Sequence, residues 1–229
     1  MTGGTQLPFA FGHRPALSDE DFLVAPCNRD AVAWIDLWPR WPTPALILHG
    51  PPGCGKTHLA GVFMARSGAR ALTLESLLAS EPSSLLADVP AAVIEDTEAM
   101  LGGDAEEALL HLHNTAGETG RQLMLTARHP PGRWQTVLPD LGSRLNAATA
   151  VGIGPPDDAL IAAVLVKLFA DRQLGVDDAL IGYMVRRMER SFATARRLVA
   201  ALDTAALAER RKITVPLVRD VLGRMDFDG

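Results

Sequence analysis

The stretch from Gly50 to Thr57 constrains the fold of this chain more than any other. It reads Gly-Pro-Pro-Gly-Cys-Gly-Lys-Thr, which is a G-x-x-x-x-G-K-T pattern. An apolar run at 45–49 precedes it, and apolar residues at helical spacing follow it over 58–66. A strand, a glycine-rich loop and a helix in this order bind phosphate, because backbone N–H groups surround the anion and the helix N-terminus adds its positive dipole end. The stretch therefore predicts a nucleotide-binding α/β domain.

Two side chains of this loop have specific expected roles. Lys56 should reach the β- and γ-phosphates, and the Thr57 hydroxyl should hold Mg²⁺. A tight glycine turn that binds nothing is the alternative, but such a turn would need neither a lysine nor a threonine at these positions. The expected cofactors are ADP or ATP with Mg²⁺. The expected nucleotide contacts are Gly50, Pro51, Pro52, Gly53, Cys54, Gly55, Lys56, Thr57 and His58.

The apolar runs on both sides of the loop predict a parallel sheet. Short runs at 71–74, 91–94, 122–127 and 148–153 indicate further strands. Helical spacing indicates helices over 28–38 with Asn28 as N-cap, over 104–117 and near 139–145, and a short helix that starts at Ser76. Because strands alternate with helices, we expect the parallel sheet to be covered on both faces.

The C-terminal part of the chain is predicted to be a separate, all-α domain. The Gly-Pro-Pro sequence at 154–156 interrupts the alternation of strands and helices. Every later segment has helical spacing, so residues 18–155 are expected to form the α/β domain and residues 156–229 a small four-helix domain. The four helices are expected at 157–172, 177–189, 191–210 and 214–225, with Asp157, Asp177, Ser191 and Thr214 as their N-caps.

Composition and charge exclude several classes of protein. No apolar run approaches the ~18 residues that a membrane-spanning helix needs. The N-terminus lacks the basic and apolar regions of a secretion signal, and two cysteines, Cys27 and Cys54, suit a reducing cytosol, so a cytoplasmic protein without membrane contact is expected. Residues 1–155 hold 10 Lys/Arg against 16 Asp/Glu, and the whole chain has a formal net charge of −5. This acidic balance argues against an autonomous duplex-DNA binder.

Glu95 and Asp96 follow the predicted strand at 91–94, where the acidic partners of a phosphate loop are expected. Glu95 would support Mg²⁺, and the pair would orient or activate an attacking water. Two adjacent acids in a solvated turn are the alternative. The usual order, Asp before Glu, is reversed here, and the extra methylene of Glu displaces each carboxylate by about 1 Å, which can cost about 10²-fold in rate. We therefore expect nucleotide binding with weak intrinsic hydrolysis.

Three more side chains are candidates for contacts with phosphate. Thr126 closes the predicted strand at 122–127 and would sense a γ-phosphate. Arg144 carries a permanent charge in a planar fork, which suits the γ-phosphate of a neighbouring subunit, and Arg196 would reach over the nucleotide of its own chain. For each arginine, a surface salt bridge is the simpler alternative.

The first residues contain an apolar group that stands out in an otherwise polar segment. Gln6, Leu7, Phe9 and Phe11 lie within residues 1–17, which are expected to be flexible. The apolar side chains either fold back on the domain or form a short linear motif that docks into a groove of a partner. The residues alone leave both interpretations open.

Several of these motifs together resemble the AAA+ ATPases, and specifically the DnaA branch. The segment at 22–29 looks like the part of that branch that lies against adenine, which implies that Val24, Pro26 and Asn28 contact the nucleotide. The segment at 139–145 looks like its arginine-finger box, and the sequence at 195–198 looks like its lid sensor. The resemblance implies that Arg144 is a trans-acting finger and Arg196 a lid sensor. It covers residues from about 6 to 225.

Within that branch, the layout is similar to replication regulators of the Hda/HdaA type. DnaA continues past its lid into a helix-turn-helix DNA-binding domain, whereas this sequence ends at Gly229, directly after the expected lid. Regulators of the Hda type begin with a peptide that binds the DNA polymerase sliding clamp, and the segment at 6–11 is similar to that motif. The resemblance therefore favours the linear motif for Gln6, Leu7, Phe9 and Phe11.

By this resemblance, the protein would regulate the initiation of chromosome replication. It would bind ADP, dock on the DNA-loaded clamp, and offer Arg144 to the ATP that DnaA holds, so that hydrolysis occurs on DnaA and contact with DNA is indirect. The alternatives are a self-contained ATPase, such as a helicase loader of the DnaC type that binds single-stranded DNA, and an adaptor that uses the nucleotide only as a gate. A homodimer that masks Arg144 is also conceivable.

Overall fold

A parallel sheet forms the centre of the larger domain. The computed structural model describes residues 23–209 and 212–225, so the segment at 6–11 with Gln6, Leu7, Phe9 and Phe11 lies outside the described residues. Within the described residues, five strands pair in the order β2-β3-β4-β1-β5, and all the pairs are parallel. The strands are β1 (Ala45–His49), β2 (Arg70–Leu72), β3 (Ala91–Ile94), β4 (Gln122–Ala127) and β5 (Thr149–Gly152).

Two sets of helices cover the two faces of this sheet. Alternate side chains of each strand enter different cores, as the two-residue period of a strand requires. Leu46, Leu48 and Met124 pack with α1 (Arg29–Leu37) and α2 (Lys56–Ser67). On the other face, Ile47 and Leu125 pack with α3 (Leu74–Ala79), α4 (Pro82–Leu86), α6 (Asp104–Thr119) and α7 (Pro139–Ala147). The predicted sheet with both faces covered is therefore confirmed.

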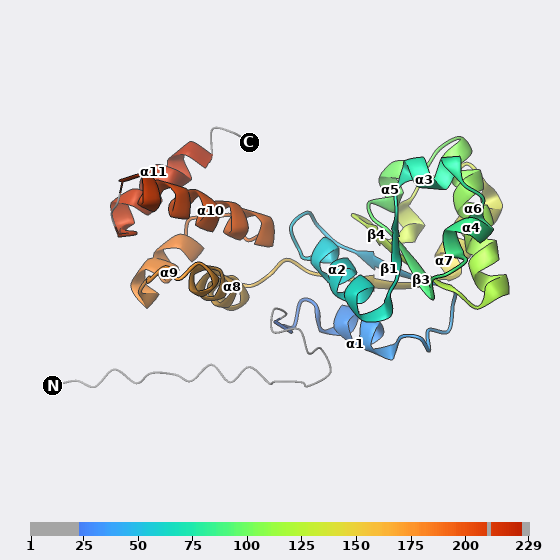
Figure 1. Cartoon of the computed structure of the whole chain (residues 1–229), viewed down its shortest axis with the longest axis horizontal. Coiled ribbons are helices and arrows are strands. Elements are labelled where there is room, and N and C mark those ends of the chain that lie inside the picture. The colour runs from blue at the N-terminus through green and yellow to red at the C-terminus, as the bar shows by residue number, and fades with distance from the viewer. Residues whose placement is uncertain (1–22, 210–211, 226–229) are drawn as a thin grey trace.

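The four described helices that follow β5 form a second domain with a core of its own. They are α8 (Asp158–Asp171), α9 (Asp178–Val185), α10 (Phe192–Glu209) and α11 (Val215–Met225). Leu165, Met184 and Leu198 are fully buried among them. Figure 1 shows these helices gathered away from the sheet and joined to it by the chain that follows β5. We refer to this domain as the lid.

Three of the four predicted N-caps of the lid make the expected side-chain bond. The carboxylates of Asp157 and Asp177 accept the N–H groups of Leu160 (2.8 Å) and Leu180 (2.7 Å). The hydroxyl of Ser191 accepts an N–H from the third residue after it, at 3.0 Å. Helix α11 begins directly after Thr214, as predicted. Each of these bonds satisfies an N–H group that the first helical turn leaves without a partner.

Helix α9 is shorter than the sequence predicts. It ends at Val185, whereas helical spacing indicated a helix to residue 189. The carboxylate of Glu189 instead accepts the Thr194 hydroxyl at 3.2 Å, and its carbonyl accepts the N–H of Ser191 at 2.8 Å. Glu189 therefore stabilises the beginning of α10 rather than the end of α9.

Two other predictions are wrong because a side chain hydrogen-bonds to a different neighbour. The strand expected at 71–74 ends at Leu72, since Thr73 and Ser76 form a capping box that begins α3. Asn28 stands at the predicted N-cap position of α1, but its side chain makes no hydrogen bond to the helix. Its side chain instead accepts the N–H of Ala25 at 2.8 Å and donates to the carbonyl of Leu23 at 3.0 Å. Asn28, which is 3% exposed, thus fixes the segment that precedes α1.

In the part of the chain that the structure describes, no helix has the length and apolarity needed to cross a membrane.

Candidate functional site

The loop between β1 and α2 lies where the central strands end. The N–H of Gly50 donates to the carbonyl of Ala127 at 3.2 Å, and a Cβ at Gly50 would lie 2.3 Å from the carbonyl oxygen of Ile153. Gly53 and Gly55 have φ angles of +73° and +102°, which side chains with a Cβ rarely adopt. The loop therefore needs glycine at these three positions, two for backbone conformation and one for close approach to the chain after β5.

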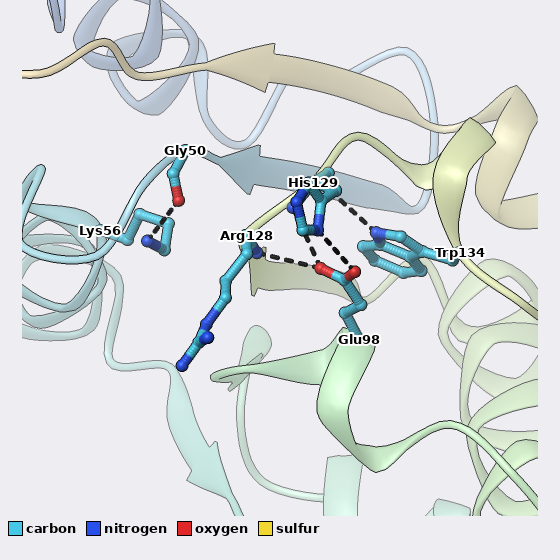
Figure 2. Close-up of polar contacts among 6 residues, drawn as sticks. All are labelled: Gly50, Lys56, Glu98, Arg128, His129 and Trp134. Carbon is cyan, nitrogen blue, oxygen red and sulfur yellow. Dashed lines mark hydrogen bonds and ion pairs between the residues drawn. The ribbon is translucent and has the colours of Figure 1, made fainter.

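Lys56 is buried within this loop. Its ammonium donates to the carbonyl of Gly50 at 2.8 Å (Figure 2) and to that of Pro51 at 3.0 Å. Only 8% of the residue is exposed. Burial raises the pKa of the Cys54 thiol although the ammonium of Lys56 acts against it, so the thiol stays neutral near pH 7. Burial and the Lys56 charge together lower the pKa of His49. Among these side chains, the positive charge belongs to Lys56.

The predicted acids and Thr126 lie together at the same edge of the sheet. Glu95 and Asp96 form the turn after β3, with Asp96 exposed and at a φ of +50°. The backbone N–H of Asp96 donates to the Thr126 hydroxyl at 3.0 Å. Thr126 is 1% exposed and lies opposite Leu48 of β1. Its hydroxyl therefore holds the acidic turn beside the strand that leads to the loop, while its role as a γ-phosphate sensor stays a prediction.

A cavity of about 240 Å³ lies between α2 and the lid. It brings together His58 and Arg196, two side chains that the sequence assigned to the nucleotide site. Of the segment predicted to lie against adenine, Leu23 lines the cavity, Val24 packs against the core under α1, and Pro26 is exposed. The other lining residues come from the lid: Leu160, Val164, Lys167, Leu168, Asp171 and Phe192.

The beginning of α10 contacts the loop directly. The N–H of Phe192 donates to the carbonyl of Gly53 at 3.0 Å. A Cβ at Gly53 would lie 2.6 Å from the Cβ of Ser191, and a Cβ at Gly55 would lie 3.2 Å from the ring of Phe192. The sequence does not reveal these contacts, since residues about 140 positions apart meet only through the placement of the lid. Ser191 was predicted only as an N-cap, and Lys167 and Asp171 only as residues of a lid helix.

Arg144 lies on α7, away from the loop of its own chain. The carbonyl of Arg144 accepts the N–H of Ala148, directly before the first residue of β5. Arg144 is therefore near the edge where the strands begin, whereas the loop lies where they end. Its guanidinium makes an ion pair with Asp140 at 3.2 Å, and 40% of the side chain is exposed. Burial, together with the charge of Arg144, lowers the pKa of His113, which lies beneath α7.

Glu98, which sequence analysis did not select, connects the acidic turn to the chain after β4. It belongs to α5 (Thr97–Met100), and its carboxylate accepts the N–H groups of Arg128 at 3.2 Å and His129 at 3.0 Å. The ring Nδ1 of His129 lies 2.8 Å from the other carboxylate oxygen, and the indole N–H of Trp134 donates to the His129 carbonyl at 2.8 Å. Figure 2 shows Glu98 facing the backbone at these residues, while the side chain of Arg128 points away.

Comparison with known proteins assigns the fold and the lid. Residues 158–222 match the family described as "Hda, lid domain". Domain III of the DnaA replication initiation protein from Thermotoga maritima superposes with a TM-score of 0.79, covering 92% of this chain and 97% of that one, at 18% identity. The lid of this chain therefore matches the Hda lid family, and the chain shares the fold of DnaA domain III. Its fold is therefore an AAA+ α/β domain followed by a helical lid.

Two further solved structures share this AAA+ fold. A DnaA bound to AMPPCP and single-stranded DNA has a TM-score of 0.66, covers 86% of this chain and 69% of that chain, and is 17% identical. The RuvB Holliday-junction branch-migration motor of Thermotoga maritima has a TM-score of 0.61, covers 79% of this chain and 61% of that chain, and is 16% identical. In the present chain, the lid residue Arg196 and the beginning of α10 lie within the family match.

Proposed function

We propose that this protein regulates the initiation of chromosome replication by promoting hydrolysis of the ATP bound to DnaA. In this proposal it binds ADP or ATP with Mg²⁺ at its own loop, docks on the sliding clamp through Gln6, Leu7, Phe9 and Phe11, and supplies Arg144 in trans. The observation that carries the proposal is the position of Arg144 on a chain with an Hda lid. Its side chain is 40% exposed, and it lies near the opposite edge of the sheet from its own phosphate loop.

Three features support nucleotide binding. The loop places the Lys56 ammonium and the N-terminus of α2 together, and the cavity with His58 and Arg196 lies on the lid side of α2. A similar fold, that of DnaA, has been solved with AMPPCP.

The Thr57 hydroxyl and the Glu95 carboxylate provide the oxygen donors that Mg²⁺ prefers, and Mg²⁺ commonly takes its other ligands from water and phosphate. When bound, Mg²⁺ would neutralise charge on the phosphates.

The ion pair of Arg144 is compatible with a role in trans. An exposed pair such as Arg144–Asp140 contributes at most about 1 kcal/mol, so the guanidinium can exchange this partner for a phosphate at small cost. A guanidinium binds phosphate oxygens through two parallel hydrogen bonds and keeps its charge as negative charge develops in the transition state. In related NTPases an arginine supplied by a partner contributes about 10³–10⁵ in rate.

The decisive experiment measures hydrolysis of DnaA-bound ATP with clamp and DNA present. We expect Arg144→Ala to abolish the stimulation, while nucleotide affinity and clamp binding stay as in the wild type. Arg133→Ala is the matched control, since Arg133 is also exposed and lies in the segment that precedes α7. If Arg144→Ala still stimulates DnaA, the finger assignment is wrong.

Clamp binding is tested separately. Gln6→Ala should weaken the affinity for the clamp without changing the affinity for ADP. A variant that binds the clamp as tightly as the wild type would remove the N-terminal motif from the proposal. Size measurement of the purified protein with and without ADP would detect a homodimer that covers Arg144.

A self-contained ATPase that binds single-stranded DNA is the second candidate, and the similar DnaA structure with single-stranded DNA favours it. It would require robust turnover by the purified protein, whereas the reversed Glu95–Asp96 order predicts weak hydrolysis. Turnover at ordinary ATPase rates together with tight binding of single-stranded DNA would replace the proposed function by this one.

A further inference from the structure

Glu106 is a carboxylate buried within the larger domain, and it belongs to none of the sequence motifs. It lies in the first turn of α6 and is 0% exposed. Its two oxygens accept the N–H of Val137 at 3.0 and 2.8 Å, and one of them also accepts the N–H of Leu138 at 2.8 Å. These two backbone groups directly precede α7, the helix that carries Arg144.

This carboxylate holds the backbone where α7 begins, a place at which the helix has no side-chain cap of its own. Leu138 occupies the N-cap position, where an apolar side chain offers no acceptor, and Pro139 has no N–H. Glu106, which belongs to α6, accepts the two backbone N–H groups just before α7. Hydrogen bonds to a charged acceptor are roughly twice as strong as neutral ones, and the negative charge also suits the positive end of α7.

The position of Arg144 depends on where and how α7 begins. Arg144 is the sixth residue of the helix, so its direction follows from the first turn. Leu141 and Leu145 bury one face of α7. The Thr136 hydroxyl packs closely against Gly142, because a Cβ added at Gly142 would lie only 2.6 Å from its oxygen. A shift of α7 by one residue would turn Arg144 by about 100° and move it by about 1.5 Å.

We propose that Glu106 is a positioning residue for Arg144, acting by fixing the start of α7. This inference rests on the proposed function, because it assigns Glu106 an effect on hydrolysis by the partner. It predicts a loss of stimulation on the order of 10²-fold when the bonds to Val137 and Leu138 are removed, since a displacement of about 1 Å can cost that much in rate. Nucleotide affinity should not change, because the phosphate loop contacts Ala127, Ile153, Ser191 and Phe192 rather than Glu106 or the backbone before α7.

The first test compares Glu106→Met with Glu107→Met. Methionine fills a similar volume without an acceptor, and Glu107 is the exposed neighbour on the same helix. We expect Glu106→Met to lower the maximal rate of DnaA-bound ATP hydrolysis about 10²-fold while ADP affinity stays unchanged, and Glu107→Met to behave as the wild type. Glu106→Gln should fall between them, because its single carbonyl oxygen can still accept both N–H groups.

A second test separates positioning from a general loss of stability. General unfolding would lower ADP binding and stimulation in parallel, whereas a displaced Arg144 lowers stimulation alone. Glu106→Met should therefore keep the ADP affinity and the ADP-binding fraction of the wild type. A fall in ADP binding parallel to the loss of stimulation would overturn the positioning role.

A third measurement does not depend on DnaA. Hydrogen exchange at the amides of Val137 and Leu138 should become faster in Glu106→Met, while the amides of α2 keep their protection. If exchange accelerates and Arg144→Ala abolishes stimulation, but Glu106→Met stimulates fully, the positioning inference fails and the proposed function stands. If Arg144→Ala itself stimulates fully, the proposed function fails, and with it any effect of Glu106 on the reaction.

Discussion

The phosphate loop is held mainly by its own residues, whereas α7 depends on carboxylates from other helices. In the loop, Lys56 bonds to the carbonyls of Gly50 and Pro51, only five or six positions away. The chain that leads to α7 is held at its start by Glu98 and at its end by Glu106, both about 31 positions earlier in the sequence. A local motif is therefore visible in the sequence, while an element held by distant side chains is not.

The largest effect that tests this comparison is expected from Lys56→Ala. It should weaken the binding of ADP and ATP by roughly 10- to 100-fold, because hydrogen bonds to charged groups contribute about 1.5–3 kcal/mol. Hydrogen exchange before α7 should not change. Arg66→Ala is the control, since Arg66 is a cation in the last turn of the same helix whose partner is Asp36 on the surface. Calorimetric titration that gives equal affinities for Lys56→Ala and wild type would contradict the assignment of the loop.

A smaller effect is expected where the lid meets the loop. Gly53→Ala should destabilise the protein by about 1–2 kcal/mol for the left-handed backbone alone, and more for the contact with Ser191. Gly61→Ala is the matched change, because Gly61 lies inside α2 with nothing within 4 Å of an added Cβ. It should stabilise by about 0.5–1 kcal/mol. Urea unfolding compares the two, and equal stabilities would show that the loop tolerates a side chain at Gly53.

The smallest effect concerns the pH dependence that Glu98 contributes. Burial acts to raise the pKa of Glu98, but the hydrogen bonds from His129 and Arg128 outweigh it and hold the pKa below its ordinary value. A carboxyl whose pKa is lowered by folding stabilises the protein above its unfolded pKa of about 4.3, and this contribution disappears as the pH falls through the folded pKa. Glu98→Gln should therefore cost about 1 kcal/mol at pH 6 and less at pH 3. Unfolding at both pH values measures this, and a cost that does not shrink with acid would contradict it.

Sequence patterns predicted the strands well where burial alone decides them. The strands at 45–49, 91–94 and 122–127 have the bounds that their apolar runs indicated, because a strand buried on both faces is apolar throughout. The candidate site was predicted in part: the loop, the acidic turn and Thr126 meet at one edge, as parallel strands require, and His58 and Arg196 line one cavity.

The misses share a physical cause, which is competition between hydrogen-bond partners. Thr73 caps α3, so β2 ends before it. Asn28 accepts the N–H of Ala25 instead of an N–H of α1. Glu189 accepts the hydroxyl of Thr194 in α10 instead of extending α9. Each polar side chain can bond to the segment before it or to the segment after it, and periodicity does not decide between them. Glu98 and Glu106 show the same limit, since an acidic residue in a first helical turn ordinarily faces solvent.

The separate core of the lid has a consequence for how such a protein can diverge. Residues such as Leu165 and Leu198 pack only within their own helical cluster, and the contacts with the phosphate loop come from the short stretch at Ser191 and Phe192. The outward faces of the lid helices can therefore accept substitutions without repacking the sheet or moving the loop. The surface that the lid presents to partners can change during evolution, provided that Ser191 and Phe192 are kept.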